Sequence, residues 1–133
     1  MKNVRRFGLA MACLASFLGT PAAAANWIYV TTGVNGTVIY YDADTIQRSG
    51  DQITVWRKLD HSRDKTIKAR EAKDRYRYDC AERTDTLLAY TDYYPDGRIE
   101  ADNIPTYRQE ASPVTPDTVG ETILETVCAA TAP

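Results

Sequence analysis

The sequence has a single histidine and lacks the short motifs that carry common enzymatic chemistry. It contains no nucleophile elbow, no phosphate-binding glycine loop and no dinucleotide-binding glycine turn. The histidine, His61, follows Asp60 in a polar stretch, where an acid–base pair is conceivable, but we expect a solvated histidine in a turn. The carboxylates are scattered and no metal-ligand cluster is visible. We therefore predict a protein that is not an enzyme, with no catalytic residue, no metal and no cofactor.

Long apolar runs are also missing. The longest, residues 7–18, is shorter than the roughly 20 residues that span a bilayer, so we expect no transmembrane segment. It follows a basic start and precedes an alanine-rich stretch, which is the three-part pattern of a secretory signal peptide. We predict that residues 1–25 are cleaved after Ala25, with Ala24 as the second choice, and that the protein is exported to the periplasm or outer cell surface. A retained membrane anchor is the alternative.

Cysteine is scarce, with three in the chain. Cys13 lies inside the predicted signal peptide, without the small-residue triplet that precedes a lipidated cysteine, so we expect it to be discarded. The spacing of Cys80 and Cys128 fits neither a CxxC redox motif nor a zinc knuckle. An even number of cysteines in an oxidising compartment predicts a disulfide between these two. Two free thiols or an intermolecular bridge are the alternatives.

Charge of both signs is present but unevenly distributed. The predicted signal peptide holds three of the 16 basic residues and none of the 18 acidic ones, so the remainder has a net charge of −5. Residues 57–77 carry nine basic and four acidic residues, so this stretch is +5 and the rest is −10. An acidic protein is a poor candidate for nucleic-acid binding, and we predict none.

The basic stretch predicts a patch that attracts polyanions such as glycosaminoglycans, lipid headgroups or acidic segments of a partner. The alternative is a solvated strand face, where lysine and arginine prevent edge-to-edge aggregation. The candidate ligand-binding residues are Lys68, Arg70, Lys73, Arg75 and Arg77.

Most of the remaining chain is typical of strands and turns. Short runs rich in tyrosine, valine, isoleucine and threonine are separated by glycine, proline, aspartate and asparagine. Residues 42–51 are expected to form a loop and residues 102–116 an irregular segment. We expect strands at residues 27–31, 37–41, 52–60, 75–80 and 86–94, and a short sixth one at 98–101.

Strand alternation assigns two faces to the predicted sheet. In the strand 52–60 the apolar residues fall on one face, while Thr54, Trp56 and Lys58 fall on the other. We single out Trp56 as a candidate aromatic contact surface, because large rigid side chains suit protein recognition. The alternative is that another element covers this side and Trp56 is part of the core. In the strand 75–80, Cys80 shares its face with two tyrosines.

The C-terminal segment predicts a helix. Apolar residues recur from Val119 to Cys128 at a helical spacing, opposite a polar face. Either Thr115-Pro116 or Thr118 with Glu121 can provide the start. Because Cys128 lies on the apolar stripe, a disulfide to Cys80 would tie the helix to one face of the sheet. We predict an α+β fold: an antiparallel sheet of about five to six strands with a C-terminal helix packed on one face and tied by a disulfide.

The order of these features resembles the surface-adhesin protein E family of small exported proteins of Gram-negative bacteria. The resemblance covers residues 27–128. It is carried by Trp27, Tyr40-Tyr41-Asp42, Ile46, Gly50, Val55-Trp56, Asp79-Cys80, Tyr90, Gly97, and Pro116 through Cys128. The resemblance implies an antiparallel sheet with a disulfide-docked helix, and an adhesin that binds host matrix or serum proteins.

We therefore expect residues 26–133 to form a single protein E-like domain that acts as an exported, non-enzymatic binding module. The partners that the resemblance implies are host extracellular-matrix or serum proteins, and a homodimer remains open. The alternative is a periplasmic structural or stress-related envelope protein without a host ligand.

Overall fold

The computed structural model describes residues 24–130. All but the last two residues of the predicted signal peptide, Cys13 among them, lie outside the described residues. The elements are β1 (Trp27–Thr32), β2 (Val38–Asp42), the 3₁₀ helix η1 (Ala43–Thr45), β3 (Gln47–Ser49), β4 (Gln52–Asp60), β5 (Glu71–Asp79), β6 (Thr84–Tyr93), β7 (Ile99–Asn103), the 3₁₀ helix η2 (Thr106–Arg108), β8 (Ser112–Pro113) and α1 (Val119–Ala129).

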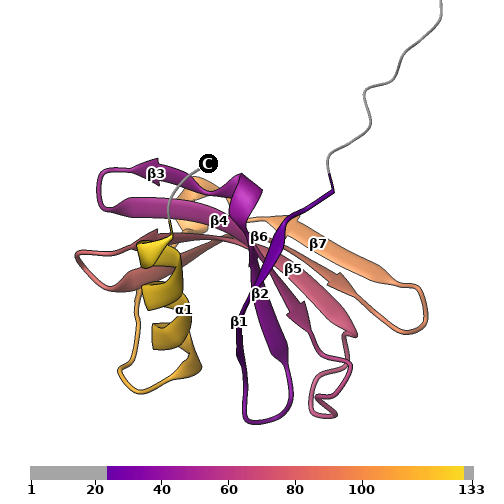
Figure 1. Ribbon diagram of the computed structural model, residues 1–133. Helices are drawn as coiled ribbons and strands as arrows, with labels where there is room; N and C mark the ends of the chain where they lie inside the picture. The colour runs from indigo at the N-terminus through magenta and orange to yellow at the C-terminus, as the bar shows by residue number, and fades with distance from the viewer. Residues whose placement is uncertain (1–23, 131–133) are drawn as a thin grey trace, which may run out of the picture.

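The strands form one antiparallel sheet in the order β1-β2-β4-β5-β6-β7 (Figure 1). β3 pairs with the first residues of β4, where β2 does not reach, and β8 pairs with the start of β6. Several neighbouring strands are joined by short turns, while residues 61–70 form a longer loop between β4 and β5. The β6–β7 turn, for example, contains Pro95 and Gly97, and Gly97 has a φ of 86°, a conformation that glycine adopts at little cost.

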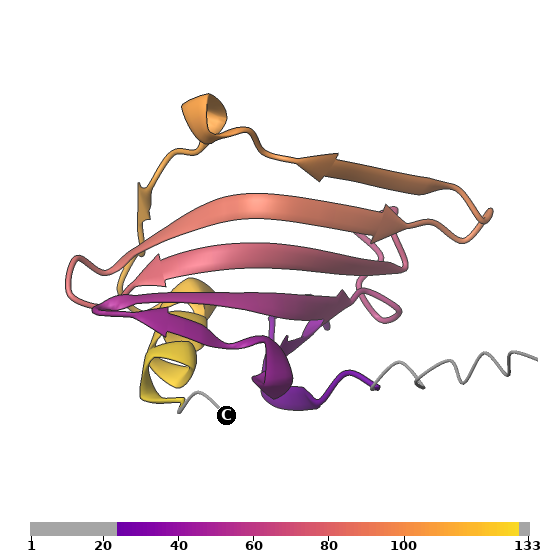
Figure 2. The same cartoon turned by 90° about the horizontal axis from the view of Figure 1, so that it is seen from above.

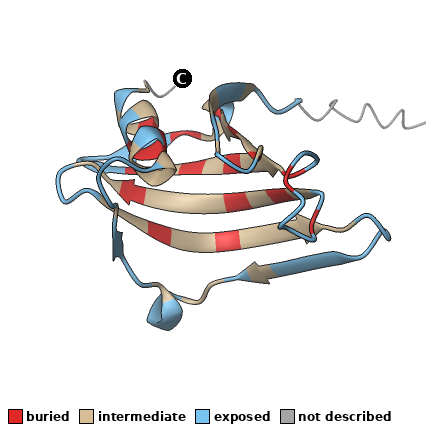
Figure 3. Cartoon of the chain, turned by 90° about the horizontal axis from the view of Figure 1, so that it is seen from below, coloured by how far each residue is buried: buried red, intermediate tan, exposed pale blue. Residues whose placement is uncertain are grey.

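The hydrophobic core lies between one face of the sheet and α1. Buried positions alternate along the central strands, as Figure 3 shows, and this alternation puts Ile53, Val55 and Tyr78 against the helix. The helix contributes its apolar stripe, and α1 also packs beside β1. The core residues are Ile39, Ile46, Ile53, Val55, Tyr78, Ile123, Leu124 and Val127. The predicted sheet-and-helix architecture is therefore confirmed.

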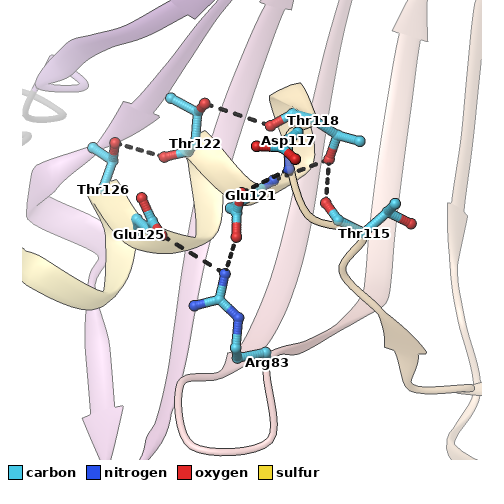
Figure 4. Close-up of polar contacts among 8 residues, drawn as sticks. All are labelled: Arg83, Thr115, Asp117, Thr118, Glu121, Thr122, Glu125 and Thr126. Carbon is cyan, nitrogen blue, oxygen red and sulfur yellow. Dashed lines mark hydrogen bonds and ion pairs between the residues drawn. The ribbon is translucent and has the colours of Figure 1, made fainter.

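Polar contacts fix the start of α1 (Figure 4). Thr118 is the N-cap residue, and its hydroxyl accepts a hydrogen bond from the backbone N–H of Glu121 at 3.3 Å. The carboxylate of Glu121 accepts from the N–H of Asp117 at 2.8 Å and pairs with Arg83 in the β5–β6 turn. Of the two predicted helix starts, the structure thus has the one at Thr118. Arg83 links this end of the helix to the sheet.

A disulfide between Cys80 and Cys128 fixes the other end of α1. The two Cα atoms are 5.9 Å apart, one just after β5 and the other in the last turn of the helix. The guanidinium of Arg48 in β3 donates to the carbonyl oxygen of Cys128 at 2.8 Å. The helix is therefore attached to the sheet at both ends, as the sequence predicts for the disulfide.

The strands differ from the predictions in three main places. β5 begins at Glu71, not at residue 75, β3 lies inside the predicted loop 42–51, and β8 lies inside the segment 102–116 that was predicted to be irregular. The alternation of apolar and polar residues does not mark the early part of β5 as a strand, because its buried positions are Ala72 and Asp74, which are small or charged. All three residues of β3 are exposed, so backbone pairing alone marks them as a strand. Over residues 24–130, no helix combines the length and apolarity that crossing a membrane requires.

Candidate functional site

The side of the sheet that points away from α1 carries a group of aromatic and basic side chains, which we name the uncovered face. They alternate with the core residues along each strand, and no helix packs on them in the part of the chain that the structure describes (Figure 2). The uncovered face consists of Trp27 from β1, Tyr40 from β2, Trp56 and Lys58 from β4, Lys73, Arg75 and Arg77 from β5, and Tyr93 from β6.

Two lysines lie directly opposite each other at the centre of this face. Lys58 of β4 pairs with Lys73 of β5 in the strand register. The Lys58 ammonium is 4.4 Å from the ring centre of Tyr40, and the Lys73 ammonium is 5.0 Å from that of Tyr93. Like charges opposite each other destabilise a sheet, and the aromatic faces offset part of that cost. An anionic group bound between the two ammonium groups would remove the repulsion.

Two shallow hollows flank Trp56 on this face. The first, of about 310 Å³, lies between the aromatic rings and Lys73, and the second, of about 290 Å³, lies over small side chains. Both are lined by Trp56 and Thr91, so they adjoin each other, and we call the two hollows together the groove. The remaining lining is Ala25, Trp27, Asp42, Lys73 and Tyr93 in the first hollow, and Ala89, Tyr90, Ala101, Asp102 and Asn103 in the second.

The structure divides the five predicted basic residues between two places. Lys73, Arg75 and Arg77 project from β5 onto the uncovered face. Lys68 and Arg70 are exposed in the β4–β5 loop and line a separate hollow of about 190 Å³. The stretch therefore does not form one continuous patch. Trp56 is half-buried on the uncovered face, where its indole lines both hollows of the groove.

The prediction of a solvated His61 was wrong. The side chain is buried, and its Nδ1 lies 3.0 Å from the hydroxyl of Thr37. The same hydroxyl donates to Asp64 at 2.8 Å. Hydrogen bonds from the hydroxyl and N–H of Thr66, and then from Thr37, lower the pKa of Asp64. The histidine is buried because this network folds the β4–β5 loop back over it, an effect of tertiary packing that local polarity does not reveal.

Sequence reasoning also missed a buried charge network under the helix side of the sheet. Arg57 donates two hydrogen bonds to the carboxylate of Asp74, at 2.8 and 2.7 Å, and one to the hydroxyl of Tyr78 at 2.7 Å. The Tyr76 ring lies 3.9 Å from the guanidinium. The available signal was a pair of opposite charges on the apolar faces of two neighbouring strands.

The charges of this network stay in place because they are paired. Burial acts to lower the pKa of Arg57, but Tyr78 and Asp74 outweigh it and the pKa rises. Burial raises the pKa of Tyr78, which therefore stays protonated and neutral. No polar side-chain atom buried within residues 24–130 lacks a hydrogen-bond partner. The network therefore serves the fold, and the groove on the other face is the better candidate for binding.

The fold and the site together define a small antiparallel sheet domain whose C-terminal helix is held by a disulfide, with an aromatic and basic face that no helix covers in residues 24–130. The family model described as surface-adhesin protein E matches residues 27–129, and the chain belongs to that family. A comparison with curated proteins gave no match.

Solved structures of Haemophilus influenzae protein E share the fold. Crystal form II has a TM-score of 0.56 at 16% identity, covering 83% of this chain and 92% of that one. Protein E from the non-typeable organism has a TM-score of 0.53 at 16% identity, covering 83% of this chain and 80% of that one. At this identity the likeness shows the common architecture, a sheet with a docked C-terminal helix.

Proposed function

We propose that this chain is an exported, non-enzymatic binding module of the adhesin type, which binds acidic segments of host extracellular-matrix or serum proteins on its uncovered face. Membership of the surface-adhesin family supports the class of function. We further propose that residues 26–133 form the single mature domain, and that the domain is displayed at the outer cell surface.

The observation that carries the proposal is the opposed pair Lys58 and Lys73 within an aromatic groove. Like charges opposite each other cost the sheet stability. The tyrosine rings and Glu71, whose carboxylate lies 3.4 Å from the Lys73 ammonium, offset part of that cost, and a binding role accounts for keeping both lysines. Trp56 supplies a broad, rigid apolar contact between the two hollows. Tryptophan and arginine are enriched among residues that dominate binding energies, and Arg75 is the cross-strand neighbour of Trp56.

The charge on the lysines favours an acidic partner. Lys58 and Lys73 would attract carboxylates, while the groove accommodates an apolar or aromatic side chain beside them. Electrostatic attraction between exposed groups weakens with salt, because the Debye length shrinks from about 10 Å at 0.1 M to about 3 Å at 1 M. We therefore expect binding that is stronger at low salt and depends on both the lysines and Trp56.

The test is binding of the mature protein to a panel of purified extracellular-matrix and serum proteins at low and high salt. The double variant Lys58→Gln/Lys73→Gln should lose most of the binding. The matched control Lys65→Gln/Lys68→Gln, in the β4–β5 loop, should retain it. Equal binding by both double variants would contradict the uncovered face as the site.

Surface labelling of intact cells tests where the protein acts. Labelling of the protein on intact cells would support display at the surface. The alternative, a periplasmic envelope protein, would be favoured by two results together. The protein would be labelled only after the outer membrane is opened, and it would bind no protein of the panel. Heparin and anionic liposomes should be included in the binding panel. Binding to them but not to the proteins would indicate that the basic groups bind other polyanions.

A further inference from the structure

Asn26, the first residue after the predicted cleavage at Ala25, is held by the turn that follows β2. Its backbone N–H donates to Oδ1 of Asp42 at 3.0 Å, and its carbonyl oxygen accepts from the N–H of Ala43 at 3.0 Å. Its side-chain amide lies 3.4 Å from a carboxylate oxygen of Asp44. Backbone and side chain are both engaged, so the position of this residue is set by the fold.

The carboxylate that accepts from Asn26 is unusual for its burial. Asp42 is 6% exposed and lies at the end of β2, paired with Trp27 in β1. Its Oδ1 also accepts from the N–H of Asp44 at 3.2 Å. Within residues 24–130, no lysine or arginine forms an ion pair with it. Buried carboxylates are normally paired with a cation, because burying an unpaired charge is costly.

We propose that Asp42 is the binding site for the mature N-terminus: hydrolysis of the Ala25–Asn26 bond turns the amide N–H of Asn26 into an α-ammonium group that forms an ion pair with the Asp42 carboxylate. In this step water adds across the peptide bond, the released Ala25 keeps the new carboxylate, and the new amine takes up a proton. The donor is already in place at 3.0 Å, so only its charge changes. The proposal rests on the predicted signal peptide and is independent of any ligand.

Cleavage at this bond also changes the groove. Ala25 lines the first hollow beside Trp27, Trp56 and Lys73, and Asp42 lines it as well. Removing Ala25 widens the hollow, while the ammonium neutralises the one carboxylate in its lining. In the mature protein the first hollow then presents Lys73 without a free carboxylate in its own lining. A chain cut after Ala24 would instead keep residue 25 in the hollow and leave Asp42 without its cation.

The test is the reactivity of the α-amine in the exported, folded protein, after intact mass has located the cut. An acylating reagent at trace level labels only the neutral amine, and mass spectrometry of the N-terminal peptide gives the rate. An unperturbed α-amine has a pKa of about 7.7–8.0, and pairing with a buried carboxylate should raise it by about one unit. At pH 7 the wild type should therefore react about tenfold more slowly than Asp42→Asn.

Matched variants make the result specific. Asp51→Asn removes an exposed carboxylate in the β3–β4 turn that makes no contact with Asn26 or Asp42, and it should leave the wild-type rate unchanged. A chain that retains Ala25 carries its amine one residue away and should react at the unperturbed rate. If Asp42→Asn fails to fold, the pH dependence of the labelling rate of the wild type in its native and denatured states gives the two pKa values to compare, because it separates the protonation of the amine from its exposure.

Three results would overturn the proposal. The first is a mature chain that begins at any residue other than Asn26. The second is a wild-type α-amine that reacts at the same rate as that of folded Asp42→Asn. The third is a wild-type amine that reacts as fast in the native state as in denaturant.

Discussion

The two faces of the sheet differ in how their side chains are held. On the helix side, Ile53, Val55 and Tyr78 have no exposed surface, and α1 is attached at both ends. On the uncovered face, Trp56 and Lys58 stay half-exposed and are packed beside aromatic rings and other cations. Neighbouring residues of one strand thus serve opposite purposes. The difference predicts that stability and binding respond to different substitutions.

The largest effect on stability is expected from the disulfide. Cys128→Ser opens a loop with a sequence separation of 48, and chain entropy for that length predicts a loss of roughly 4 kcal/mol. The 11-residue α1 is too short to be stable alone, so its amides should exchange faster. Denaturant unfolding and hydrogen exchange measure both. Cys80→Ser should behave alike, and the double variant should be no worse; melting that is indifferent to reductant would contradict this.

The buried ion pair should come next. Asp74→Asn leaves Arg57 charged in the interior without its counter-charge, which should cost about 3 kcal/mol of unfolding free energy. The double variant Arg57→Met/Asp74→Leu removes both charges but leaves the buried hydroxyl of Tyr78 without its donor, so it should be more stable than Asp74→Asn and less stable than the wild type. Urea unfolding of the three proteins checks this. A double variant as unstable as Asp74→Asn would mean that shape, not charge pairing, determines the contribution of this site.

The sequence was sufficient for the parts of the fold that follow from local patterns. Alternation in β4 separates Val55 from Trp56, and the helical stripe of α1 carries Cys128. The disulfide prediction then connects the two patterns. These features are predictable because strand and helix periodicity depends only on neighbouring residues.

The candidate site was only partly predictable, because it depends on which strands become neighbours. Sequence reasoning selected Trp56 and Lys73, but the opposition of Lys73 to Lys58 is a property of the β4–β5 register. It grouped Lys68 with the strand residues, although Lys68 lies in the β4–β5 loop. The burial of His61 likewise depends on Thr37, which lies 24 residues away in the sequence.

A smaller effect on stability is expected from the lysine pair. Lys58→Gln removes like-charge repulsion and also the cation–π contacts to Trp27 and Tyr40. These effects have opposite signs, so the unfolding free energy should change by less than about 1 kcal/mol. Because salt screens the repulsion, the variant should be more stable relative to the wild type at low salt than at high salt. Thermal melts at two ionic strengths test this. A loss above 2 kcal/mol would place Lys58 among the residues that maintain the fold.

The smallest effect is expected at Asp92 in β6. Burial and the nearby Glu100 raise the pKa of Asp92, so the folded state disfavours its charged form. A carboxyl group whose pKa is higher in the folded state than in the unfolded state opposes folding at neutral pH. This opposition weakens as the pH falls through the folded-state pKa and is gone below the unfolded-state pKa. Asp92→Asn should therefore stabilise the protein at pH 7 by roughly 0.5 kcal/mol or less, and the gain should vanish below about pH 4. Unfolding curves at pH 7 and pH 3.5 provide the test; a gain that grows on acidification would contradict it.

The most direct test of the division between the two faces compares Val55→Ala with Trp56→Ala, adjacent residues of β4 that point to opposite sides of the sheet. For each variant we would measure the unfolding free energy and the affinity for a matrix or serum protein that the wild type binds. Val55→Ala should lose about 2 kcal/mol of stability and keep its affinity while folded. Trp56→Ala should lose at least about tenfold in affinity and much less stability than Val55→Ala. If Val55→Ala loses affinity while folded, or Trp56→Ala keeps it, the account of the two faces is contradicted.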